Sequence, residues 1–314
     1  MRDIARAQGV PFVDLFHPTL KIYDESKHLL TINGIHLTED GNRRAALEID
    51  EALFGGDTPR DWEKLEKLRQ AVLDKNFYWF HRYRVLDGYN VYGGRAFERY
   101  ADKQSNYEDQ QRELEILDVM TSNRDKRIWA VAQGKDFKVD DSNTPPFLPV
   151  KTNKPGKGPN GEHIYLDGEK AIEKMTLGKN LKINLFASEK EFPELAKPVQ
   201  MQFDAKGRLW VAVWPSYPHW KPKEEMNDKI LIFEDTNGDG KADKMTVFAD
   251  RLHCPTGFDF YNGGVLVAQA PDLMFLKDTD GDGTADLRVR VLSGLDSADT
   301  HHTSNSFALD PGGA

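Results

Sequence analysis

Two sequence units recur in the second half of the chain, and they restrict the fold more than any other feature. The first unit spans residues 201–213, returns at residues 258–268 and begins again at residues 307–313. In each copy a segment with apolar residues leads into a glycine turn, and in the first two copies a second apolar segment follows, which predicts a hairpin of two strands. The copies follow one another at spacings of about 49 to 57 residues.

The second unit lies between these hairpins. Residues 232–240 match residues 275–283 at a spacing of about 43 residues. Two hairpins per repeat with this period are typical of a β-propeller blade, whereas a chance pair of sandwich hairpins would not require both units to recur together. We therefore predict a partial β-propeller, about two blades and the start of a third, which needs the missing remainder of its own chain to close.

Each copy of the second unit contains an acidic loop. The oxygen-bearing positions are Asp235, Asn237, Asp239 and Asp243 with the carbonyl of Lys241, and Asp278, Asp280, Asp282 and Asp286 with the carbonyl of Thr284. Side chains at positions 1, 3 and 5 point oxygens at one hard cation, and a glycine at position 6 permits the sharp turn. The loops are not complete EF-hands, because Thr246 and Val289 occupy position 12. We predict structural calcium sites; the alternative is an acidic turn held by Asx hydrogen bonds alone.

The remaining chain predicts a multidomain organisation. Residues 1–56 contain a strand at residues 10–15 and an amphipathic helix at residues 39–54, which indicates the tail of an α/β domain. Residues 57–133 form a helical connector whose aromatic run should pack onto a neighbouring domain. Residues 134–180 have the composition of a linker. The all-β part, the partial propeller, takes up residues 181–314.

Composition excludes several classes of function. The formal net charge is −9 and no basic stripe is present, so we expect no nucleic-acid partner. Cys254 is the single cysteine, so the chain has no internal disulfide and no Cys-x-x-Cys-His haem attachment motif; we interpret Cys254 as a structural thiol. The first residues contain no apolar signal core. Met1 opens into what we predict to be the middle of a domain. The missing signal peptide is therefore only weak evidence for a cytoplasmic location.

A pair of histidines precedes the third copy of the hairpin unit. His301 and His302 lie in the segment of residues 299–305, Asp-Thr-His-His-Thr-Ser-Asn. On a propeller loop they could face the central channel, where one would act as a base toward an alcohol or bind a metal. The alternative is a polar loop whose histidines hydrogen bond to the backbone.

Residues 33–41 resemble the last conserved block of the SGNH (GDSL-type) lipase and acylhydrolase family. His36 matches the catalytic histidine of that family, and Asn33 stands where an orienting aspartate is usual. An amide can accept a hydrogen bond from the imidazole but cannot stabilise imidazolium by charge. The Gly-Asp-Ser block of the nucleophile would lie upstream of Met1, so we expect this chain alone to lack esterase activity. The alternative to a catalytic role is that His36 is a structural loop residue.

The order of these parts, with residues 78–82, 92–95 and 123–130, resembles the large putative membrane-bound dehydrogenases of planctomycetes and related bacteria. That resemblance implies a propeller similar to glucose and sorbosone dehydrogenases, which use pyrroloquinoline quinone. It also implies helical repeats and a haem-binding domain downstream.

From this resemblance we expect oxidation of a sugar or alcohol with electrons passed to haem, a periplasmic or cell-surface location that is membrane-associated, and His301 or His302 as the base. Two rivals stay open. One is an SGNH-type esterase acting on carbohydrate esters, and the other is a non-catalytic, calcium-stabilised binding propeller.

Overall fold

The computed structural model describes residues 1–56, 61–84, 87–99, 103–151, 155–296, 298–300, 302–308 and 310. The chain divides into two units, residues 1–67 and residues 68–314. Helix α4 (Trp62–Tyr83) crosses the boundary between them. No helix among the described residues combines the length and the hydropathy that a membrane span requires.

The first unit is helical. It contains α1 (Arg2–Gln8), α2 (Phe16–Glu25) and α3 (Glu39–Phe54). The helix predicted at residues 39–54 is confirmed as α3. It begins where the Thr38 side chain accepts a hydrogen bond from the Gly41 amide, and it ends at Gly55, whose φ of 80° suits a residue without a side chain.

The strand predicted at residues 10–15 is wrong. These residues are irregular, and Val10 and Phe12 are 55% and 41% exposed. A β-strand needs a partner strand for its main-chain hydrogen bonds. Among the described residues of the first unit, the one bridge joins Thr31 to Leu37, so no strand is present with which residues 10–15 could pair.

The second unit opens with helices. After α4 come α5 (Gly88–Val91) and α6 (Asn106–Ala132), and α6 starts at a capping box formed by Ser105 and Glu108. The stretch predicted as a linker is mostly irregular and holds a short 3-10 turn, η1 (Pro159–Gly161), and α7 (Gly168–Ile172).

Two four-stranded antiparallel sheets follow, each with its strands in sequence order. The first sheet consists of β1 (Pro198–Phe203), β2 (Leu209–Val213), β3 (Asp228–Glu234) and β4 (Lys244–Leu252). The second consists of β5 (Gly257–Tyr261), β6 (Gly264–Gln269), β7 (Asp272–Lys277) and β8 (Leu287–Ser293). The predicted hairpin units correspond to β1–β2 and β5–β6, and both acidic loops directly follow the third strand of their sheet.

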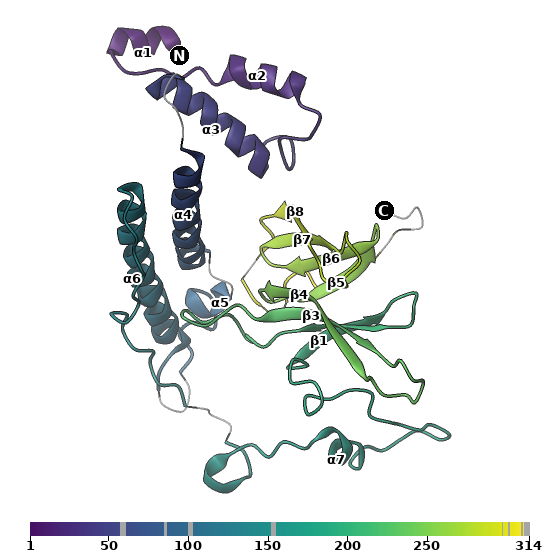
Figure 1. The fold of residues 1–314 in the computed structure, drawn as a ribbon. Helices are drawn as coiled ribbons and strands as arrows, with labels where there is room; N and C mark the ends of the chain where they lie inside the picture. Colours follow the sequence, from purple (N-terminus) through teal and green to yellow (C-terminus); the bar gives the residue numbers. More distant parts are fainter. Residues whose placement is uncertain are drawn as a thin grey trace. The chain divides into compact units, whose positions relative to one another are not determined.

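The two sheets lie beside one another (Figure 1) and share an apolar core. Trp210, Ile232 and Phe248 of the first sheet pack against Phe258 and Val267 of the second. The side-chain amide of Gln200 in β1 donates to the carbonyl of Phe258 in β5 at 2.9 Å, so the first strands of the two sheets are neighbours. This core aligns the loops at each end of the two sheets.

The described part of the predicted third hairpin copy, residues 307, 308 and 310, contains no strand. The residues just before it lie against the start of β5, where the Thr256 hydroxyl donates to the carbonyl of Ser304 at 2.8 Å. The chain thus runs next to the first strand of the second sheet without forming a sheet of its own among the described residues.

Candidate functional site

The acidic loops form two near-identical structures at one end of the sheets. In the first, the Asp235 carboxylate accepts hydrogen bonds from the amides of Gly238 (2.6 Å) and Gly240 (2.8 Å). In the second, Asp278 accepts from Gly281 (2.6 Å) and Gly283 (2.9 Å). These amide hydrogen bonds hold the pKa of each carboxyl below its usual range. The glycines at position 6 have φ values of 86° and 94°, which only a residue without a side chain adopts readily.

Further side chains close each loop. Asp243 accepts from the Thr236 amide (3.1 Å) and Asp286 from the Thr279 amide (2.7 Å). Other contacts join oxygens of position 3 or 5 to amides two residues on, namely Asn237 to Asp239, Asp239 to Lys241, Asp280 to Asp282, and Asp282 to Thr284. These are the Asx hydrogen bonds of the alternative interpretation. They leave lone pairs on the carboxylates, because two oxygens offer about four acceptor sites.

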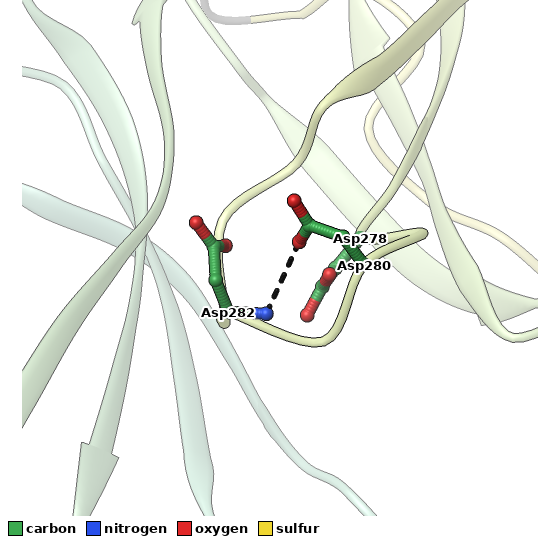
Figure 2. A group of neighbouring side chains, drawn as sticks. All are labelled: Asp278, Asp280 and Asp282. Carbon is green, nitrogen blue, oxygen red and sulfur yellow. Dashed lines mark hydrogen bonds between the residues drawn. The ribbon is translucent and has the colours of Figure 1, made fainter.

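The second loop brings three carboxylates together. One oxygen each from Asp278, Asp280 and Asp282 lies within 4.8 Å of the others (Figure 2). Oxygen ligands at such separations suit a hard cation. In the first loop Asn237 replaces the middle carboxylate, so that loop offers one negative charge fewer. The roles of the Lys241 and Thr284 carbonyls as ligands stay predictions.

A second polar group lies at the opposite end of the sheets, where the chain leaves β8. The Nδ1 atom of His302 is 3.2 Å from the Asp299 carboxylate, and the Arg95 guanidinium is 2.7 Å from the same carboxylate. Arg95 also lies 3.4 Å from the fully buried Asp87, whose carboxyl pKa is raised by burial. His301, the other histidine of the predicted pair, lies outside the described residues.

Sequence reasoning missed Asp87 and Arg95 as partners of this loop. They come from the connector before α6, about two hundred residues away in the chain. The sequence singled out residues 92–95 only as part of a family resemblance. No spacing rule joins such distant residues, so their contact with Asp299 could be found only in three dimensions.

A cluster of one buried and two half-buried histidines lies where α4 and α6 meet the sheet loops. Here His81, His219 and His253 line a cavity of about 30 Å³, sufficient for a water molecule. The aromatic run of α4 packs here within the second unit: the Phe77 ring lies 5.4 Å from Trp220 and the His81 ring 5.1 Å from it. Within the same run Trp79 is 50% and Tyr83 65% exposed, so only one face of the helix is covered.

The histidines of this cluster differ in their partners. His219 Nε2 lies 2.9 Å from the Glu113 carboxylate, whereas its Nδ1 atom is buried without a hydrogen-bond partner. The Trp220 amide donates to His253 Nε2 at 3.2 Å, so this nitrogen is unprotonated. Burial lowers the pKa of His81 to about 4 and that of His253 well below its usual value. Both side chains are therefore neutral at pH 7.

One buried carboxylate fixes the loops that carry two of these histidines. Asp228 accepts hydrogen bonds from the amide (2.9 Å) and hydroxyl (2.7 Å) of Ser216 and from the amide of Cys254 (2.7 Å). Ser216 precedes His219 and Cys254 follows His253, so Asp228 positions both. Cys254 itself is 2% exposed, and burial raises the pKa of its thiol well above the usual value, which fits the structural role predicted for it.

The SGNH-like block forms a tight loop in the first unit. The imidazole Nδ1 of His36 lies 3.0 Å from Nδ2 and 3.1 Å from Oδ1 of Asn33, and the same side-chain Oδ1 accepts from the His36 main-chain amide at 2.9 Å. Asn33 and His36 are thus in side-chain contact, and the SGNH-type role of this pair stays a prediction.

Comparison with known proteins gives one match. Residues 167–312 match the family model of a domain of unknown function, DUF7133. No curated protein matches the chain, and no solved structure matches it. The matched region contains both sheets, both acidic loops and His302.

Proposed function

We propose that the two sheets are consecutive blades of a β-propeller and that this propeller belongs to an extracytoplasmic dehydrogenase-like protein that oxidises a sugar or other alcohol. The sequential antiparallel order of both sheets and the contact between β1 and β5 support a radial arrangement. The contact between His302 and Asp299 carries the catalytic part of the proposal.

The histidine would serve as the proton acceptor. When Nδ1–H donates to Asp299, the lone pair lies on Nε2, which can take the proton of a substrate hydroxyl. Arg95, 2.7 Å from the same carboxylate, keeps Asp299 oriented. The hydrogen on the alcohol carbon would leave with both electrons as hydride to an organic two-electron acceptor, and the haem domain that the resemblance implies would take up these electrons.

The described residues do not by themselves fit pyrroloquinoline quinone. That cofactor carries three carboxylates, so its site needs cations or N–H donors that are not already paired with acidic side chains. Beside His302 the structure places Arg95, whose charge is already matched by Asp299 and by Asp87. The proposed role of this chain is therefore limited to the base and its orientation.

A dye-linked dehydrogenase assay on the complete natural polypeptide, with a panel of sugars and alcohols, tests the proposal. We expect His302→Ala to lower kcat by at least about 100-fold, the contribution of a general base. His17→Ala is the matched control, because His17 also pairs with an aspartate, Asp14, at 2.7 Å on an exposed surface. Equal activity of the two variants would remove His302 from the reaction. Absence of dye reduction in the unmodified protein would favour the binding propeller.

We also propose calcium at the acidic loops. With dissociation constants of about 0.1 to 1 mM, typical of extracellular modules, 10 mM Ca²⁺ should stabilise each loop by about 1.4 to 2.7 kcal/mol. Thermal unfolding of the chain with and without chelator measures this as a rise in Tm.

Asp280→Asn removes one of the three clustered carboxylates and should abolish the part of the shift that comes from the second loop. Asp140→Asn is the control, because Asp140 forms an exposed Asx turn outside the loops. If the Tm is the same with and without Ca²⁺, the calcium proposal is wrong and the loops are acidic turns held by Asx hydrogen bonds.

A second candidate activity, hydrolysis of a carbohydrate ester, is favoured by the contact between Asn33 and His36. Its nucleophile block is expected upstream, so this chain alone should not turn over nitrophenyl acetate. Turnover that disappears in His36→Ala would show that a nucleophile is present within these residues.

A further inference from the structure

We propose that residues 181–187 are the fourth, outermost strand of a further antiparallel sheet, and that their partner is a three-stranded sheet that lacks a fourth strand of its own. This inference deepens the propeller proposal by naming a partner surface. It does not depend on the proposed dehydrogenase activity.

The first observation is a sequence match to an outer strand. Residues 182–188 read Lys-Ile-Asn-Leu-Phe-Ala-Ser, and residues 244–250 read Lys-Met-Thr-Val-Phe-Ala-Asp. The latter belong to β4, the fourth strand of the first sheet. The match aligns Phe186 with Phe248 and Asn184 with Thr246.

The second observation is that both segments receive the same main-chain contact. The amide of Ala285, in the second acidic loop, donates to the carbonyl of Phe248 at 2.7 Å. The amide of Ala242, at the same position of the first acidic loop, donates to the carbonyl of Phe186 at 2.8 Å.

The glycine at position 6 of each acidic loop also contacts matching residues of the two segments. Gly283 lies against the Thr246 side chain, and Gly240 lies against the side chain of Asn184, which donates to its carbonyl at 2.7 Å. Residues 184–186 therefore contact the acidic loop of the first sheet in the same way that residues 246–248 contact the acidic loop of the second sheet.

Packing follows the same correspondence. Phe248 and Ala249 cover the face of the second sheet that carries Val267 and Leu276. The matching residues Phe186 and Ala187 cover the face of the first sheet, where Val211, Leu231 and Phe233 are buried. Residues 181–187 thus take the place of the outer strand of a preceding sheet.

One difference remains, and it identifies the partner. β4 is paired along its length with β3, whereas residues 181–187 pair with no strand among the described residues. Residues 181–187 need a strand with which to pair, as β4 pairs with β3. The preceding segment cannot supply it, because the described residues from 155 to 180 form η1 and α7 and contain no strand. An extended segment with unpaired N–H and C=O groups is a template for strand addition.

A second copy of the chain does not offer the required edge. The strand that pairs with an outer strand is the third of its sheet, and both third strands, β3 and β7, are already enclosed between two neighbours. The occupant we infer is therefore a three-stranded meander of the same repeat, supplied by polypeptide outside the described residues.

Hydrogen–deuterium exchange tests this on two samples, the chain of 314 residues and the polypeptide isolated from its natural source. In the 314-residue chain, we expect amides of residues 181–188 to exchange at least about 100-fold faster than those of β4, because strand pairing is what protects them. In the natural polypeptide, the two segments should be protected alike.

Fast exchange of residues 181–188 in both samples, or slow exchange in both, would overturn the proposal. Protection that rises with concentration of the 314-residue chain would identify a second copy as the occupant and would equally overturn it. Phe186→Ala should remove the protection in the natural polypeptide, whereas Phe137→Ala, in the irregular stretch after α6, should not. Since exchange is measured without substrate, loss of the dehydrogenase proposal would leave this result unaffected.

Discussion

Replacing Asp228 by alanine should lower the free energy of unfolding by about 3 to 5 kcal/mol, because it leaves three buried donors, two from Ser216 and one from Cys254, without an acceptor. Asp228→Asn preserves the shape but replaces one acceptor oxygen by a donor, so it should cost nearly as much. Urea denaturation with m-value analysis measures both.

Asp250→Asn is the matched control. Asp250 also lies near the end of a strand and accepts from Arg288 at 3.0 Å, but its side chain is 47% exposed, so the loss should stay below about 1 kcal/mol. Equal effects of the two substitutions would show that Asp228 does not hold the loops together. If only the Asp228 variants lose stability, the loops that carry His219 and His253 should also become more mobile. Hydrogen exchange of the amides in these loops should then be faster.

Acidification from pH 7 to pH 5 should destabilise the second unit through the buried histidines. His81 stays neutral in the folded protein until its pKa of about 4, whereas in the unfolded chain it takes up a proton below about 6.5. The unfolded state therefore binds more protons, and stability falls as the pH falls, by about 2 kcal/mol for His81 over this range. His253, whose pKa is also lowered by burial, adds to the loss in the same direction.

The groups that face His81 make this experiment specific. His253 and Trp220 from the sheet loops contact its ring, and His219 from a sheet loop and Glu113 from α6 line the same cavity. His81→Phe keeps a ring against Phe77 and Trp220 but cannot be protonated, so it should reduce the pH dependence of unfolding by about 2 kcal/mol. His28→Phe, at an exposed site in the first unit, should leave it unchanged. An unaltered pH dependence in His81→Phe would contradict the assignment.

The sheets and the acidic loops could be predicted from sequence because their information is local. Strand alternation and glycine turns fix each hairpin, and Asp235 and Asp278 lie within five residues of the amides that they bind. The α3 boundaries were equally accessible, since Thr38 and Gly55 are cap signals.

The rest depends on contacts between distant segments. The apolar run around Phe12 predicted a strand, but strand formation needs a partner, which sequence alone does not reveal. The cluster of His81, His219 and His253 joins one helix to two loops, and no spacing rule connects the three histidines. Asp87 and Arg95 were missed for the same reason. Spacing rules describe a turn or a helix, whereas buried polar clusters arise from packing.

The hydrogen bonds from Ala242 to Phe186 and from Ala285 to Phe248 have a consequence for how the protein unfolds. Each acidic loop is attached to the segment that precedes its sheet, residues 184–186 for the first sheet and β4 for the second, so neighbouring units of the chain stabilise one another. Such a linear series behaves as a nearest-neighbour array, in which stability is a sum of unit and interface free energies. Damage at the interface between the two sheets should then weaken both of them, so that cooperativity is lost in steps.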